Sequence, residues 1–266
     1  MAKQAHLDLT VAGSSVVSVN RLLREDGVTS ETCDAVVAEV PVAMSFNGIS
    51  YAVMMATPSD LEDFIRGFAI GEGIVDGAPA IYDIEIEPAD LGVAVNATVS
   101  NETAHRLKSR RRSMAGPSGC GLCGIESIEQ MTRCIEPLET GTLPSQSALD
   151  KALSDMRARQ VVSQSTSGAH AAIWCDMDGN IVSVREDVGR HNALDKLIGW
   201  HSQNANSGFV LVSSRASYEM VAKAATAGIG VLAAVSAPTS MAVETAKTAN
   251  LKLIAFASSG RYALYS

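Results

Sequence analysis

The sequence predicts an α/β protein in which a smaller α+β domain precedes a larger α/β domain. In the second half of the chain, short apolar segments typical of strands alternate with segments of helical pattern, which indicates parallel strands joined by helices. Only 5% of the residues are aromatic, whereas small aliphatic residues are plentiful, as in the cores of α/β proteins. With 47% hydrophobic and 19% charged residues, the composition is that of a globular protein.

The patterns divide the chain into three parts. Residues 1–34 are expected to be loosely structured. Residues 35–140 are predicted to form the small α+β domain, which ends in a cysteine-containing loop and the helix after it. Residues 141–266 are predicted to form the α/β domain, with a linker at its start that contains Gly and Pro.

The small domain is predicted from strand patterns on either side of one helix. Residues 35–55 are rich in β-forming residues and contain Asn47-Gly48, a hairpin turn signal. Ser59 and Glu62 have the spacing of a capping box, which predicts a helix that begins at Ser59. Residues 81–99 return to an alternating strand pattern.

The segment that ends the small domain has a different character. Residues 105–124 carry a run of Lys and Arg followed by a stretch rich in Gly, Pro and Ser, which predicts a mobile, exposed loop. A helical pattern follows from Ile125 to about Leu138.

The α/β domain has the clearest pattern. Strands at 170–176 and 181–185 are predicted to form a hairpin at Asp178-Gly179, and a helix follows from about His191 to Trp200. The remaining elements are a strand at 208–213, a helix at 217–227, a strand at 230–235, a helix at 240–249 and a strand at 251–257. In parallel sheets of this kind, ligands bind at the carboxyl ends of the strands, opposite helix N-termini.

Composition argues against several classes of protein. A net charge of −8 disfavours nucleic-acid binding. The longest apolar stretch, 228–237, is shorter than the ~20 residues of a membrane helix, and the N-terminus lacks the pattern of a secretion signal. Five cysteines, two of them close together, fit a cytoplasmic protein whose thiols are catalytic or bind a metal.

The first candidate site is Cys120-Gly121-Leu122-Cys123. Flanking glycines would let this loop expose both sulfurs, and the nearby arginines and the N-terminus of the following helix favour the nucleophilic thiolate. One alternative is a structural zinc site, which needs two further ligands although no second CxxC occurs. Another is a thioredoxin-type dithiol, which is expected directly after a strand of a βαβ unit.

Three further candidates follow predicted strands of the α/β domain. In REDVGRHNALDK (185–196) charged groups cluster where a strand turns into a helix, and the alternative is a salt-bridged helix cap. Ser213-Ser214-Arg215 follows the next strand and has a helix N-cap as its alternative. In FASSGR (256–261) backbone N–H groups, hydroxyls and Arg261 could hold a phosphate, the alternative being a surface turn.

His170 is not a convincing zinc ligand. Zinc deaminases carry H-x-E before a P-C-x-x-C motif, whereas here Ala172 stands in place of the Glu and the CxxC precedes the His. We therefore interpret His170 as a satisfied core or turn histidine.

Six segments combine into a recognisable set of motifs. They are NGISYAVMMATPSDLEDF (47–64), GCGLCG (119–124), REDVGRHNALDKLIG (185–199), SSRASYEMVAKA (213–224), AAVSAPTSMAVETA (233–246) and FASSGRYALYS (256–266). Together they closely resemble the formate dehydrogenase accessory sulfurtransferase family, FdhD. The likeness extends from about Val36 to the end of the chain, and the combination of REDVGRHNALDK with CxxC is highly specific.

The resemblance implies a sulfurtransferase of the cytoplasm. Such a protein takes sulfane sulfur from a cysteine desulfurase, carries it as a cysteine persulfide, and passes it to the bis-molybdopterin guanine dinucleotide molybdenum cofactor, which then enters the formate dehydrogenase apoenzyme. By the family's pattern, Cys120 is the persulfide carrier and Cys123 its accessory thiol. The resemblance also implies a homodimer and a larger domain similar to the cytidine deaminase fold.

The cofactor-binding residues expected from the resemblance form one stretch at the C-terminus. They are Phe256, Ala257, Ser258, Ser259, Gly260 and Arg261. To these we add the polar residues at the other strand ends, namely Arg185, Asp187, Arg190, His191 and Arg215. The sequence departs from the family pattern at Ser258, where relatives often have a basic residue, and at Ser167, where they tend to have glycine.

Two other functions remain as alternatives. A non-catalytic chaperone would bind the molybdenum cofactor and escort it to formate dehydrogenase, with both cysteines dispensable. A zinc hydrolase or deaminase would contain stoichiometric zinc.

Overall fold

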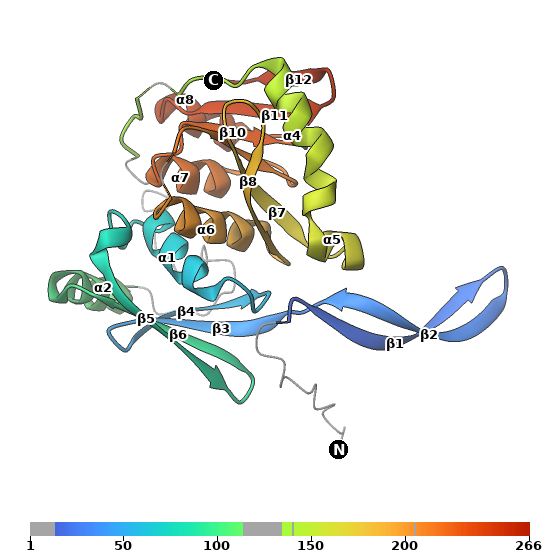
Figure 1. The fold of residues 1–266 in the computed structure, drawn as a ribbon. Coiled ribbons are helices and arrows are strands. Elements are labelled where there is room, and N and C mark those ends of the chain that lie inside the picture. The colour runs from blue at the N-terminus through green and yellow to red at the C-terminus, as the bar shows by residue number, and fades with distance from the viewer. Residues whose placement is uncertain (1–13, 114–134, 140, 205) are drawn as a thin grey trace.

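The computed structural model describes residues 14–113, 135–139, 141–204 and 206–266. It shows a mixed α/β protein, and the described strands form a two-stranded, a four-stranded and a six-stranded sheet (Figure 1). Among the described residues, no helix combines the length and the apolar character that a membrane span requires.

The N-terminal part contains an extended hairpin. Strands β1 (Val16–Glu25) and β2 (Val28–Val37) pair along their full length and turn at Asp26-Gly27, where both residues have positive φ (49° and 82°). An Asp-Gly pair at two left-handed positions is the signature of a type I′ hairpin turn. The expectation of loose structure is therefore wrong for residues 16–34, while residues 1–13 lie outside the described part.

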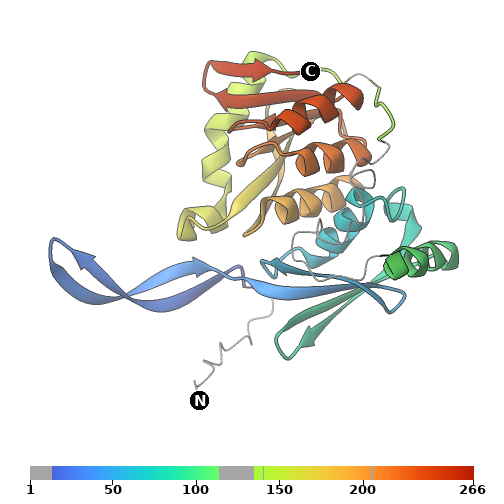
Figure 2. The same cartoon turned by 180° about the vertical axis from the view of Figure 1, so that it is seen from behind.

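The hairpin projects from the body of the molecule as an arm (Figures 1 and 2). Its strands pair with no other strand of the described chain. Its base packs against the body through the short helix α5 (Val161–Thr166).

The four-stranded sheet follows the predicted pattern. Its strands are β3 (Val40–Phe46), β4 (Ile49–Ala56), β5 (Ile81–Ala89) and β6 (Gly92–Val99), in the order β4-β3-β6-β5. The predicted turn at Asn47-Gly48 is confirmed, with φ of 48° and 71°. Alternate residues of β3 and β6 are buried, so one face of this sheet forms part of the core.

Helix α1 (Leu61–Gly71) covers that face. It begins two residues later than predicted, because Asp60 occupies the N-cap position with a left-handed φ of 52° and no side-chain cap. The backbone N–H of Ser59 instead donates to the carbonyl of Thr57, so the predicted capping box does not form. A single turn of 3₁₀-helix, η1 (Ala78–Ala80), precedes β5.

Residues 105–113 form part of helix α2 (Asn101–Ser113), so the predicted loop is wrong there. Ala104 and Leu107 are buried in the core, and the guanidinium of Arg106 donates to the carbonyl of Ile74 at 3.1 Å. Residues 114–124 lie outside the described part. The predicted helix to Leu138 is not seen at residues 135–139, which have no regular secondary structure.

The six-stranded sheet confirms the predicted order of elements in the second half. Strands β9, β10 and β11 are parallel, and β7, β8 and β12 complete the sheet in the order β12-β11-β10-β9-β7-β8. The bounds are β7 (His170–Cys175), β8 (Ile181–Asp187), β9 (Phe209–Val212), β10 (Val231–Ala234), β11 (Lys252–Ser258) and β12 (Arg261–Leu264).

Helices cover both faces of this sheet (Figures 1 and 2). On one face lie α6 (Arg190–His201), α7 (Tyr218–Thr226) and α8 (Ser240–Thr248), and on the other lies α4 (Gln146–Arg159). The residues under α4 form their own apolar cluster, whereas those under α6–α8 join those under α1 in one continuous core. The two larger sheets therefore share a core.

Helices α1 and α6 approach each other closely because glycines face the contact. A Cβ atom on Gly67 would lie 1.6 Å from the backbone oxygen of Asp195, and one on Gly199 would lie 1.9 Å from that of Asp63. No side chain fits at either position, so the backbones of the two helices are nearly in contact.

We expect Gly67→Ala to lower the free energy of unfolding by more than about 2 kcal/mol, because the added methyl group must push two helix backbones apart. Urea denaturation measures this difference. Gly77→Ala is the matched control: its Cβ would meet only Pro79 at 3.7 Å. Equal stability of the two variants would contradict the close packing.

Candidate functional site

The candidate site lies along one edge of the six-stranded sheet. Strands β8, β9, β10 and β11 all end there, and the N-termini of α6, α7 and α8 follow from them. Because β7 runs antiparallel to β8 and β9, its first residue lies at the same edge. This carboxyl edge brings together the described candidates, which come from residues 185–191, 213–215 and 256–261.

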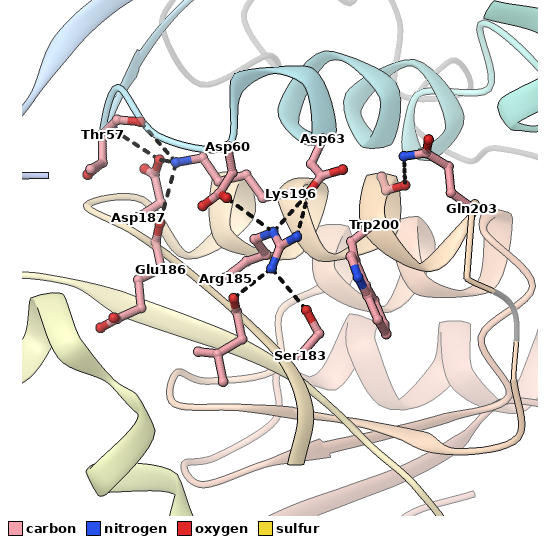
Figure 3. A network of polar contacts seen from close by, with 12 residues as sticks. Thr57, Asp60, Asp63, Ser183, Arg185, Glu186, Asp187, Lys196, Trp200 and Gln203 are labelled. Carbon is pink, nitrogen blue, oxygen red and sulfur yellow. Dashed lines mark hydrogen bonds and ion pairs between the residues drawn. The ribbon is translucent and has the colours of Figure 1, made fainter. Parts of the chain in front are cut away.

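Asp187 and Lys196 form a fully buried ion pair, with 2.7 Å between Nζ and Oδ2 and no exposed side-chain surface. The carboxylate also accepts hydrogen bonds from the backbone N–H groups of Thr57 and Gly189 and from the amide of Asn192. Lys196 donates a further bond to the carbonyl of Thr57 at 2.9 Å (Figure 3). Asp187 is thus a buried anchor of the helix start, as in the alternative of a salt-bridged cap.

Arg185 points toward α1 (Figure 3). Its Nε and Nη2 both donate to Oδ2 of Asp63, at 2.9 and 2.6 Å, and its Nη1 donates to Ser183 and to a backbone carbonyl. Burial raises the pKa of Asp63, and the hydrogen bonds and charge of Arg185 partly offset that effect. Arg185 therefore links the end of β8 to helix α1.

Glu186, between these two residues, faces the opposite side of the sheet. Its carboxylate accepts the backbone N–H groups of Val162 and Ser163, both at 2.8 Å, and so satisfies two free donors at the start of α5. It holds α5, and with it the base of the hairpin arm.

Arg190 is the first residue of α6 and is partly buried. Its Nε atom is buried and has no hydrogen-bond partner among the described residues. A buried N–H group without an acceptor is costly, and more so when it is charged. Arg190 is thus a cation at the carboxyl edge with a donor left unused.

His191 contacts two groups on α7 and its N-cap. Its Nε2 lies 2.7 Å from Oε2 of Glu219 and 3.3 Å from Oγ of Ser217. The hydrogen bond from His191 lowers the pKa of Glu219, more than burial raises it. Because both partners lie on the same ring nitrogen, the three residues are not arranged as a serine–histidine–acid relay, in which they contact opposite nitrogens.

The Ser213-Ser214-Arg215 segment lies beside this group. Ser213 accepts the backbone N–H of Ala171, and Ser214 donates to the carbonyl of Arg215. The N-cap of α7 is Ser217, so the alternative of a cap at 213–214 is wrong. Arg215 is exposed at the edge.

Phe256 has an unusual backbone. Its φ is 52°, its side chain is 43% exposed, and it lies in a bulge where β11 shifts register against β12. A bulky residue in the left-handed region is strained. The N–H of Phe256 donates a hydrogen bond to the carbonyl of Ser236 in this conformation.

The turn after Phe256 is only partly open to a ligand. The backbone N–H of Gly260, one of the groups predicted to hold a phosphate, donates to Oδ1 of Asp150 on α4 at 2.8 Å and is already in use. Ser258, Ser259 and Arg261 are exposed beside it.

Of the five cysteines, the structure describes Cys33 and Cys175. Cys120, Cys123 and Cys134 lie outside the described part. Cys175 is buried on β7, where desolvation raises its pKa to about 12, so this thiol is unreactive. Cys33 is exposed on the arm.

Sequence reasoning missed the partners of the charged motif. Thr57, Asp63 and Glu219 are far from it in the chain and are brought to it only by the fold. A signal for each existed, because Thr57 and Asp63 lie within the family-like segment 47–64 and Glu219 within 213–224.

Comparison with known proteins identifies the family of this chain. Residues 37–266 match the model of the FdhD/NarQ family. The chain belongs to the FdhD/NarQ family. It is 49% identical over 255 residues to the sulfur carrier protein FdhD of Cupriavidus necator, covering 95% of this chain and 88% of that one. The sulfur carrier protein FdhD of Acinetobacter baylyi is 48% identical over 237 residues, covering 88% and 86%.

A crystal structure from Desulfotalea psychrophila has the same fold as this FdhD/NarQ member. The two structures align with a TM-score of 0.74 at 22% identity, covering 95% of this chain and 97% of the other.

We expect Lys196→Met to lower the free energy of unfolding by roughly 3–5 kcal/mol, because it leaves the carboxylate of Asp187 buried without its charge partner. Chemical denaturation checks this. Lys247→Met removes an exposed ion pair with Glu244 (3.3 Å) and should cost less than about 1 kcal/mol. The ion pair would not be an anchor if both variants were equally stable.

Proposed function

We propose that this protein is a sulfurtransferase that delivers sulfur to the bis-molybdopterin guanine dinucleotide molybdenum cofactor needed by formate dehydrogenase. Two facts support the sulfur chemistry. Relatives that share almost half of its residues are named sulfur carrier proteins, and its sequence contains the pair Cys120 and Cys123 in a Gly-rich segment. We further propose that it acts as a homodimer.

The observation that carries the cofactor part of the proposal is the unused cationic donor at the carboxyl edge. Arg190 has a buried Nε without a partner in the described chain, and Arg215 and Arg261 are exposed along the same edge. The guanine nucleotides of the cofactor, here a substrate, contain pyrophosphates, which guanidinium groups bind in a fork geometry. The exposed ring of Phe256 offers a flat apolar surface on which a purine can stack.

The candidate binding residues then fall into two groups. Arg190, His191, Arg215, Phe256 and Arg261 are proposed to contact the cofactor. The other residues are proposed to position the backbone around the ligand. The side chains of Arg185 and Asp187 fix the end of β8. The bulge and the turn after Phe256 are formed by Ala257, Ser258, Ser259 and Gly260.

The proposed transfer onto Cys120 is balanced without an oxidant. The Cys120 thiolate attacks the outer sulfur of the desulfurase persulfide, a new S–S bond forms, and the donor's S–S bond breaks. The desulfurase cysteine leaves as a thiolate, and Cys120 holds the sulfane sulfur. Nucleophilic attack of this kind requires the thiolate form, which nearby cations favour.

We expect Cys120→Ala to abolish maturation of formate dehydrogenase while leaving folding and cofactor binding unchanged, because only the sulfur-carrying step needs this thiol. Formate dehydrogenase activity in cells without another copy of the protein measures maturation. Intact-mass spectrometry after incubation with a desulfurase and cysteine should show a gain of ~32 Da, one sulfur atom, in the wild type and none in the variant.

Cys33→Ala is the control, because it removes a thiol that is exposed on the arm and should retain both the mass gain and maturation. Full maturation by Cys120→Ala would favour the chaperone alternative. Stoichiometric zinc in the purified protein would favour the zinc alternative.

A further inference from the structure

His170 is placed differently from what the sequence indicated. It is the first residue of β7 and lies opposite Asp187 of β8 at the carboxyl edge. The side chain is partly buried, and within the described residues its imidazole makes no hydrogen bond. The interpretation of His170 as a core or turn histidine is therefore wrong in its placement, because the residue begins a strand and is only partly buried.

The groups around His170 leave the positive charge of Arg190 without a carboxylate partner in the described chain. Arg190 and His191 approach it from α6, and both act on it electrostatically. The nearby carboxylates are engaged elsewhere: Asp187 pairs with Lys196, Glu219 of α7 pairs with His191, and Glu186 caps α5. Directly after β9, the neutral Ser213 lies beside the start of β7, where its hydroxyl accepts the backbone N–H of Ala171.

The protonation of His170 responds to these groups. Burial lowers its pKa, the charges of Arg190 and His191 lower it further, and Asp187 partly opposes them. The imidazole is thus held in its neutral form beside a guanidinium whose Nε has no acceptor in the described chain.

We propose that His170 belongs to the anion-binding surface and gains a proton from solvent when a pyrophosphate binds beside Arg190. This inference rests on the proposed function, since the pyrophosphate is that of the nucleotide cofactor. A bound dianion offsets the charge of Arg190, which removes its repulsion against a second cation beside it. The protonated ring can then donate a charge-assisted hydrogen bond to a phosphate oxygen.

The sign of the pH dependence follows from this linkage. The complex binds one more proton than the free protein at a pH between the two pKa values of His170. Affinity therefore rises as the pH falls through that range, by up to about tenfold per pH unit for one proton.

Isothermal titration calorimetry with GDP-mannose tests the proposal. Both phosphates of this probe are esterified, so the probe itself does not titrate near neutral pH. We expect the binding enthalpy of the wild type to differ between two buffers of different ionisation enthalpy, which reports proton uptake. His170→Gln should bind more weakly with an enthalpy independent of the buffer. His105→Gln on α2, away from the carboxyl edge, should retain the proton uptake.

The outcomes separate this inference from the function on which it rests. No binding of GDP-mannose to the wild type would overturn both. Binding without proton uptake, or uptake that persists in His170→Gln, would overturn only the role of His170. If the variant is unstable, the NMR titration of the His170 ring in the wild type decides: its midpoint should move to higher pH with GDP-mannose, and an unmoved midpoint refutes the proposal.

Discussion

The buried ion pair between Asp187 and Lys196 is the constraint on which the arrangement of the site depends. Burying two charges is unfavourable unless their remaining donors and acceptors are satisfied, and here backbone groups of Thr57 and Gly189 and the amide of Asn192 complete the network. Since Thr57 follows β4 and Asp187 ends β8, the network joins the two larger sheets. It also holds the start of α6, so the neighbouring Arg190 and His191 are fixed at the carboxyl edge.

The close contact of α1 with α6 reinforces this link through packing. Gly67 and Gly199 let the helix backbones approach, and Arg185 of β8 adds a double hydrogen bond to Asp63 of α1. Helix α1 and the end of β4 therefore support the site without supplying the groups proposed to contact a ligand. Within the charged motif at 185–196, Arg185, Asp187 and Lys196 provide this support, which explains why the motif fits both a structural and a functional interpretation.

The success of sequence reasoning depended on how local each signal was. The elements after residue 170 were predicted because period, turn residues and strand order are short-range features, and the carboxyl edge follows from their topology. The hairpin at Asp26-Gly27 was equally local but overlooked, and α2 was missed because its basic residues suggested a solvated loop. The pairing of His191 with Glu219 and the open environment of His170 depend on distant segments, which no spacing reveals.

The left-handed backbone of Phe256 favours glycine over a bulky residue at that position. A left-handed conformation of a bulky residue costs on the order of 1–3 kcal/mol, and glycine would adopt it freely. Packing of the Phe256 ring offsets little of this conformational free energy, because much of the ring surface faces solvent. The protein is thus less stable than it would be with glycine at this position, and in return it presents an aromatic ring to solvent. A screen for stabilising substitutions would select glycine here and remove that ring.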